Sequence, residues 1–298
     1  MKFCPTLGEP LKVLCFEMHG FAVSLSFTLD TSSGPFSFQL GLVRTDELLI
    51  HEEVLRENIN LIEESIQRTK IQYDPIIVDE KTSVVLDGMH RTEVARLLKL
   101  KFVLAMKVNY SDSRIQLGTW TRVIQGKLEF ALNLAEVEFG PPRQGESSSL
   151  LTVSGMQGSK TFNLQGRDTL EKYLQLNRFI EKLQSNSVGK FRETKYEAHP
   201  SLDDEHVALI PPVITKAEVI ETAKARRVFP PKSTRHVFPV RVFFASLPRR
   251  LLETGPLSDD ESERAVLAYL RTKGTVIVKG KRTFGGRYYE EEELLFLI

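Results

Sequence analysis

The chain has 298 residues, with 40 Lys and Arg against 39 Asp and Glu and a formal net charge of +1 at pH 7. This length allows two domains with separate cores, and the balanced charge gives no argument for nucleic acid or an anionic membrane as a partner. Two cysteines without a C-x-x-C spacing cannot build a disulfide framework. No apolar stretch reaches the ~18 residues of a membrane span, and residues 1–30 lack the order of a signal peptide, so we expect a cytoplasmic protein.

The first third of the chain begins with a strand pattern and continues with a helix pattern. Apolar and polar residues alternate over 11–43, which predicts two or three antiparallel strands. A helix is expected after His51, because apolar residues recur at helical spacing over 55–66. Glu52 and Glu53 are expected in its first turn, where acidic side chains interact favourably with the helix dipole.

The next residues predict a hairpin, a helix and a strand. Short β-branched runs at 75–78 and 84–86 are joined by a polar turn, which predicts a β-hairpin ending at Asp87. Apolar residues at 94–98 predict a second amphipathic helix, and 102–110 predicts another strand. The predicted order is therefore helix, hairpin, helix, strand.

A Gly-, Pro- and Ser-rich stretch at 140–149 predicts an exposed connection. We therefore expect one domain at 1–142, with a strand extension at 1–43, and a second domain at 147–298. In the second domain the pattern predicts a hairpin at 151–164, a helix at 173–183, a strand at 207–210, a helix begun by a Thr215 cap, and a hairpin turning near Gly285 and Gly286.

Asp87-Gly88-Met89-His90-Arg91-Thr92 lies where the predicted hairpin meets the second helix. Gly88 allows the backbone to approach a ligand closely, and the helix start offers N–H groups. Together with the polar side chains that follow, these groups suit phosphate oxygens. An Asp cap followed by solvated His and Arg side chains fits these six residues equally well.

A second candidate site is the basic loop Pro230–His236. Two prolines stiffen it, and Lys232, Thr234, Arg235 and His236 place cations and a hydroxyl within five residues. Such a loop can bind a carboxylate or phosphate, although a solvated basic loop is the structural alternative. The two motifs together favour a shared anionic site.

The run 51–110 resembles the ParB-like nucleotide-binding module, in which a helix, a hairpin ending in an Asp-Gly-x-His-Arg-like motif, a helix and a strand occur in this order. A Cys in that motif would indicate sulfiredoxin, and none is near. The segment 227–239 is similar to the C-terminal signature of archaeal free-serine kinases, and Ile50-His51-Glu52 and Trp120 match that family in the same order. The resemblance implies an α+β fold: a ParB-like N-terminal module and a mixed α/β C-terminal domain, with the active site in the cleft between them.

The same resemblance implies a free L-serine kinase that yields O-phospho-L-serine, a precursor that can feed cysteine biosynthesis. It implies that Glu52 is the catalytic base and that Asp87 orients the reacting groups or helps to hold Mg²⁺ with the nucleotide phosphates. The implied nucleotide- and phosphate-binding residues are His51, Gly88, Met89, His90, Arg91 and Thr92. The implied serine-binding residues are Leu55, Trp120, Lys232, Thr234, Arg235 and His236.

The resemblance implies either ATP or ADP as the phosphoryl donor. Met89 stands where family members commonly have His, and segments at roughly 1–40 and 250–298 flank the matched region. These departures from the compact ADP-using members favour ATP. The flanking segments could build a dimer interface, so we expect a monomer or a homodimer.

Two alternatives from other classes remain. A ParB-type DNA-binding clamp predicts a helix-turn-helix after the module and a basic groove. Residues 111–139 carry only scattered cations and hairpins follow, so we expect no nucleic-acid partner. The second alternative is a sensor that binds a nucleotide or an amino acid without catalysis.

Overall fold

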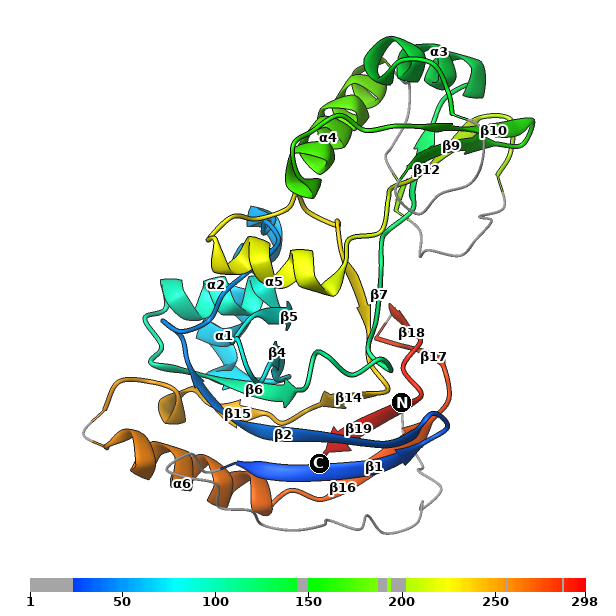
Figure 1. Ribbon diagram of the computed structural model, residues 1–298. Coiled ribbons are helices and arrows are strands. Elements are labelled where there is room, and N and C mark those ends of the chain that lie inside the picture. The colour runs from blue at the N-terminus through cyan, green and yellow to red at the C-terminus, as the bar shows by residue number, and fades with distance from the viewer. Residues whose placement is uncertain (1–23, 144–149, 187–191, 194–201, 256, 286) are drawn as a thin grey trace. The chain divides into compact units, whose positions relative to one another are not determined.

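The computed structural model describes residues 24–143, 150–186, 192–193, 202–255, 257–285 and 287–298 (Figure 1). Its contacts divide the chain into two compact units. Unit 1 contains the described residues up to Ile50, together with Val54–Gln116 and Val237–Ile298, and unit 2 contains His51–Glu53 and Leu117–His236. Among the helices described, none combines the length and the apolar character that a membrane span requires.

The main sheet of unit 1 has five strands. In spatial order they are β1 (Leu25–Thr31), β2 (Gly34–Arg44), β6 (Phe102–Val108), β4 (Ile76–Asp79) and β5 (Val85–Asp87). β1 and β2 form a long hairpin, drawn in blue in Figure 1, whose alternating pattern buries Phe27 against Phe38 with ring centroids 5.1 Å apart. The two strands confirm the strand prediction for this part, while 11–23 lies outside the described residues. β6 lies centrally, which explains its nearly continuous apolar sequence.

Two helices accompany this sheet in the predicted order. α1 (Arg56–Thr69) ends at Lys70 in the left-handed conformation, and α2 (Met89–Leu97) follows β5 directly. The predicted order of helix, hairpin, helix and strand is therefore confirmed. The expectation that Glu52 and Glu53 lie in the first turn is wrong, because the helix begins at Arg56. Glu52 is instead in extended backbone and forms a β-bridge with Phe229, and both residues belong to unit 2.

The C-terminal residues return to unit 1 and build a second sheet there. Its strands, in spatial order, are β14 (Val240–Phe243), β19 (Glu293–Leu297) and β16 (Thr275–Lys279). β17 (Arg282–Phe284) and β18 (Arg287–Tyr289) form the hairpin that the sequence predicts around Gly285. The remaining elements are α6 (Asp259–Arg271), the short pair β3 (Ile71–Gln72) and β15 (Leu247–Pro248), and a 3₁₀ turn at Arg249–Leu251.

Unit 2 has its own sheet and core. The strands, in spatial order, are β10 (Gly158–Phe162), β9 (Leu151–Gly155), β12 (His206–Ile210), β8 (Arg122–Gln125) and β11 (Arg192–Glu193). The helices are α3 (Leu128–Phe139), α4 (Thr169–Asn186) and α5 (Lys216–Lys224). Phe139, Phe162 and Phe179 lie at the centre of the core between α3, α4 and the sheet. α5 begins with a capping box formed by Thr215 and Glu218, which confirms the Thr cap.

The contacts group the chain differently from the sequence-based division at 142–147. That stretch lies between α3 and β9 inside unit 2, and residues 144–149 lie outside the described part. The chain instead passes from one unit to the other near His51 and within β7 (Gln116–Gly118) and β13 (Arg235–Val237). A linear cue in composition cannot reveal such a division, because unit 1 is assembled from segments that are distant in sequence.

Candidate functional site

The predicted phosphate motif occupies the turn between β5 and α2 in unit 1. Gly88 has a φ of 100° and is the N-cap residue of α2. A Cβ at this position would lie 2.7 Å from Cγ2 of Ile76, so the close approach of the helix start to β4 requires glycine. The first N–H groups of α2 have no acceptor within the helix, which is the property that suits an anion.

Arg91 turns back and braces this turn. Its Nη2 donates to Oδ2 of Asp87 at 2.8 Å, and its Nη1 donates to the carbonyl oxygens of Asp74 (3.0 Å) and Pro75 (2.6 Å). Both Nη1 hydrogens are therefore used inside the protein. The Arg91 guanidinium therefore stabilises the turn between β5 and α2, in addition to any contact that it makes with phosphate.

His90 and Thr92 also have internal partners. The N–H of Leu55 donates to Nε2 of His90 at 2.9 Å, so a neutral His90 ring carries its proton on Nδ1 and joins the starts of α1 and α2. Thr92 is fully buried and its hydroxyl donates to the carbonyl of Gly88 at 3.2 Å. Met89 is half-buried at the first position of the helix.

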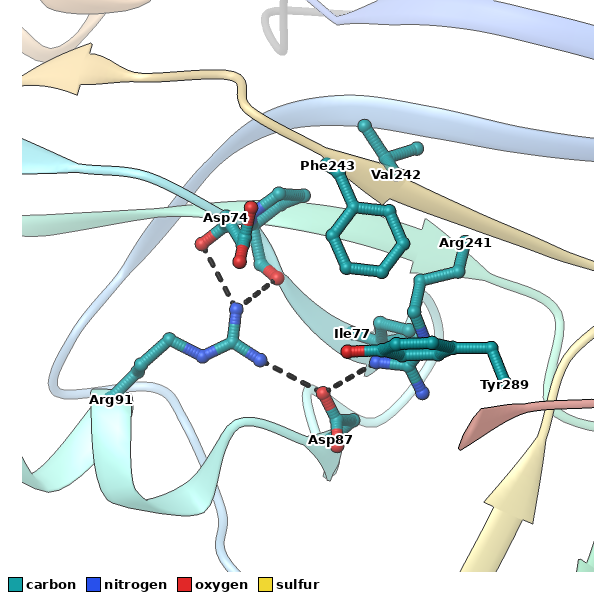
Figure 2. Close-up of a pocket in the computed structure, with 9 residues that line it drawn as sticks. Asp74, Ile77, Asp87, Arg91, Arg241, Val242, Phe243 and Tyr289 are labelled. Atoms are coloured by element: carbon teal, nitrogen blue, oxygen red, sulfur yellow. Dashed lines mark hydrogen bonds and ion pairs between the residues drawn. The ribbon is translucent and has the colours of Figure 1, made fainter. Parts of the chain in front are cut away.

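A polar pocket of about 210 Å³ lies beside Asp87 in unit 1 (Figure 2). Its lining residues are Asp74, Pro75, Ile77, Asp87, Arg91, Arg241, Val242, Phe243 and Tyr289. The side chains of Arg91 and Arg241 approach the Asp87 carboxylate from two sides, and Nη1 of Arg241 donates to the same Oδ2 at 2.9 Å. One carboxylate oxygen therefore accepts from two guanidinium groups.

Arg241 is a buried cation that the sequence analysis missed. Its side chain is 7% exposed, and its Nε donates to Oε1 of Glu291 at 2.8 Å. Burial opposes the charge of Arg241, but the carboxylates of Asp87 and Glu291 outweigh this effect and hold its pKa above the ordinary value. The available signal was a lone Arg inside the apolar strand Val240–Phe243, because a charge in such a strand requires a buried partner.

The second group of candidate residues lies in unit 2 and is centred on Glu52. Its Oε1 accepts the N–H of Lys232 at 2.7 Å, and its Oε2 accepts the N–H of Thr234 at 3.0 Å and the Thr234 hydroxyl at 2.8 Å. The N–H of Phe229 donates to the carbonyl of His51 (2.8 Å), and the N–H of Glu53 donates to the carbonyl of Phe229 (2.9 Å). The basic loop thus folds directly around the carboxylate of Glu52.

The environment of Glu52 acts on its pKa in two directions. Burial raises the pKa of the carboxyl above its ordinary value, and the hydrogen bonds from Thr234 and Lys232 lower it. Nε2 of His51 lies 2.9 Å from the Thr234 hydroxyl oxygen. Because an ionised Glu52 can only accept, the Thr234 hydroxyl donates to Glu52 and His51 donates to Thr234. His236 packs edge-on against His51, with ring centroids 5.6 Å apart.

Trp120 organises the outer side of the basic loop. Its Nε1 donates to the carbonyl of Thr234 at 3.0 Å, and the cationic groups of Lys232 and Arg235 lie 5.2 and 5.3 Å from its ring centroid. Nη2 of Arg122 donates to the carbonyl of Pro231 at 2.6 Å, a support that the sequence analysis did not identify. Trp120 and Arg122 therefore both hold the backbone of the loop, and two cations lie against the Trp120 ring.

The predicted residues fall into two sets. The Asp87–Thr92 motif is in unit 1, together with Leu55, which is 41% exposed at the N-cap of α1. His51, predicted among the phosphate-binding residues, is in unit 2. It lies there with Glu52 and with the predicted serine-binding residues Trp120, Lys232, Thr234, Arg235 and His236.

Comparison with known proteins gives several relatives of this chain. No family model matches the chain. An ATP-dependent L-serine kinase of Staphylothermus marinus is 28% identical over 216 residues, covering 66% of this chain and 85% of the relative. A ParB-like protein of Sulfolobus acidocaldarius is 26% identical and covers 68% and 92%. An ADP-dependent L-serine kinase of Thermococcus kodakarensis is 22% identical and covers 66% and 86%.

Solved structures show the fold. A C-terminally truncated SbnI of Staphylococcus aureus has a TM-score of 0.66 at 16% identity and covers 78% of this chain and 96% of that protein. A free serine kinase in complex with AMP has a TM-score of 0.58 at 18% identity and covers 72% and 93%. The chain thus has the mixed α/β, ParB-like fold of these proteins, which confirms the expected fold class.

Proposed function

We propose that this protein is a nucleotide-dependent free L-serine kinase that transfers a phosphoryl group to the serine hydroxyl. The observation that carries the proposal is the buried Glu52 carboxylate, which accepts hydrogen bonds from backbone N–H groups and a hydroxyl of the basic loop. The similarity to curated L-serine kinases, which extends over 66% of the chain, supports it independently. The product, O-phospho-L-serine, would feed cysteine biosynthesis.

Glu52 is the proposed general base. Its Oε2 already accepts two hydrogens, whereas its Oε1 accepts one from the described residues. A carboxylate oxygen has two lone pairs, so Oε1 is the atom that can take the proton of the serine hydroxyl. The raised pKa makes this carboxylate a stronger base than an exposed glutamate, which favours proton transfer near neutral pH.

The basic loop is the proposed serine-binding element. Lys232 and Arg235 supply cations suited to the carboxylate of free serine, and the Trp120 ring fixes both. His236 is buried beside His51 and would contribute a ring nitrogen. We also propose Leu55 as a serine-binding residue, on the resemblance to the serine kinases alone.

The turn Gly88–Thr92 is the proposed phosphate cradle, chiefly through the N–H groups at the start of α2. Among the described residues, no group of three or more acidic, His or Cys side chains is placed to hold a metal. Asp87 is one carboxylate with two guanidinium partners, so Mg²⁺ would be bound mainly by nucleotide phosphates and would offset their charge. The residues of the chain act by orientation and by donating hydrogen bonds.

Incubation with L-serine and one pure nucleotide at a time tests the function. We expect phosphoserine with ATP and Mg²⁺, accompanied by one equivalent of ADP, and none when serine is omitted. If ADP yields phosphoserine and AMP while ATP yields no phosphoserine, the donor is ADP and not ATP. The proposal that the protein is a serine kinase would still hold. Nucleotide or serine binding without any phosphoserine would instead support a sensor, and nucleotide-dependent DNA retention would support a ParB-type clamp.

The hydroxyl of Thr234 gives a prediction for the pH dependence of turnover. Because it donates to Glu52, it lowers the pKa of a carboxyl that burial raises. Thr234→Val removes that donor, so the acidic limb of the kcat profile should move to higher pH, and Thr234→Ser should keep it near the wild-type position. The profile is measured with saturating serine and nucleotide. An unchanged acidic limb in Thr234→Val would show that Glu52 does not set it.

A further inference from the structure

The strand pairing of unit 1 brings the C-terminal segment to the pocket beside Asp87. β14 and β19 are parallel, with Val240 opposite Glu293, and the N–H of Glu293 donates to the carbonyl of Pro239 at 3.1 Å. The residues just before β19 therefore lie beside the start of β14, where Arg241 is located. This segment lies beyond residue 250, after the last of the sequence motifs that resemble the serine kinases.

Glu291 is one of these residues; it does not line the pocket itself but contacts Arg241, which does. It is 4% exposed, and its Oε1 accepts from Nε of Arg241 at 2.8 Å. The guanidinium of Arg241 also lies 5.6 Å from the ring centroid of Phe238 and 5.8 Å from that of Tyr289. Figure 2 shows the Tyr289 ring lying along the guanidinium of Arg241. The orientation of Arg241 is thus fixed by a carboxylate and by two aromatic rings.

The orientation of Arg241 fixes Asp87 in turn. Oδ2 of Asp87 accepts from Arg241 at 2.9 Å and from Arg91 at 2.8 Å, and two donors on one oxygen prevent free rotation of the carboxylate. The four groups carry two positive and two negative charges, so the cluster is neutral as a whole. Neither guanidinium is left with an uncompensated charge.

We propose that Glu291 is a positioning residue of the kinase: it holds Arg241, which together with Arg91 sets the direction in which the Asp87 carboxylate faces the bound nucleotide. The proposal rests on the proposed function. It gives the C-terminal segment a role in catalysis. Glu291 itself does not line the pocket.

Glu291→Gln keeps the shape of the side chain and removes its charge. Arg241 then has only Asp87 as a carboxylate partner, and the cluster gains one positive charge beside the phosphate cradle. We expect kcat to fall about 10- to 100-fold, because a small misplacement of an orienting group costs this much. We expect nucleotide affinity to rise severalfold, because the added charge attracts phosphate. Damage to the fold would weaken binding.

Glu293→Gln is the matched control. Glu293 is also 4% exposed and lies two positions further along, but its ion-pair partner is Lys279, with a nitrogen–oxygen distance of 3.8 Å. We expect wild-type kcat and nucleotide affinity in this variant. Glu291→Asp adds a second test, because it keeps the charge and shortens the reach: kcat should fall while the dissociation constant for the nucleotide stays at the wild-type value.

Calorimetric titration with ADP and phosphoserine assays on the same preparations give both readouts. The proposal is supported if Glu291→Gln loses turnover and binds ADP more tightly than Glu293→Gln. It is overturned if these two variants behave alike, or if Glu291→Gln and Glu291→Asp lose turnover and affinity together. Wild-type protein that makes no phosphoserine would overturn the proposed function itself, and this outcome is visible before any variant is compared.

Discussion

Glu52→Gln should reduce the rate of phosphoserine formation by about 10²- to 10⁴-fold, the usual contribution of a general base. The amide has nearly the same shape as the carboxylate, but it cannot accept the proton of the serine hydroxyl. Nucleotide affinity should remain close to that of the wild type, because the substitution leaves the Asp87–Thr92 motif and its internal hydrogen bonds unchanged. Single-turnover rates and ADP titration measure the two quantities separately.

Glu53→Gln is the control for this prediction. Glu53 is exposed and follows Glu52 in extended backbone, where successive side chains point to opposite sides. It should keep the wild-type rate. If Glu52→Gln keeps more than about a tenth of the wild-type rate, Glu52 is not a general base with the usual contribution of about 10²- to 10⁴-fold. Another group would then have to accept the proton.

The sequence predicted the elements of unit 1 well where the information was local. The order of α1, the hairpin β4–β5, α2 and β6 follows from hydrophobic periodicity and turn residues, both of which are read within a few positions. The same holds for the N-cap at Thr215 and for the hairpin near Gly285. Each of these features is stabilised chiefly by neighbours in the chain.

The start of α1 was predicted too early for a reason that is not local. Glu52 has the composition of a first helical turn, but the hydrogen bonds of its neighbours to Phe229 hold it in extended backbone. Burial of its carboxylate under Lys232 and Thr234, 180 and 182 positions away, adds a further long-range constraint. The role that the resemblance gives Glu52 stays a prediction, whereas the helical element on which the periodicity placed it is wrong.

The sequence indicated only those parts of the candidate site that are contiguous in the chain. The motifs at Asp87 and at the basic loop are contiguous in sequence and could be recognised as donors for an anion. Arg241 and Glu291 have no such motif, and their roles arise only when parallel pairing of β14 with β19 places them beside Asp87. A buried charge could be suspected from the strand sequence, but its partners could not be identified.

Arg241→Met should destabilise unit 1 by about 3–5 kcal/mol, because it leaves the buried Glu291 without the cation of Arg241 and removes a guanidinium that pairs with Asp87. Urea unfolding of the purified protein measures this change. A loss below about 1 kcal/mol would mean that the ion pair between Arg241 and Glu291 contributes little to stability.

The double variant Arg241→Met, Glu291→Leu separates stability from catalysis. Apolar side chains of similar volume remove both buried charges, and such replacements of buried ion pairs are often neutral or stabilising. We therefore expect the double variant to recover most of the unfolding free energy lost in Arg241→Met. Turnover should stay low, because Asp87 then retains only Arg91 as a guanidinium partner and its carboxylate can rotate. Recovery of turnover together with stability would show that Arg241 serves the fold alone and that Asp87 needs no second guanidinium.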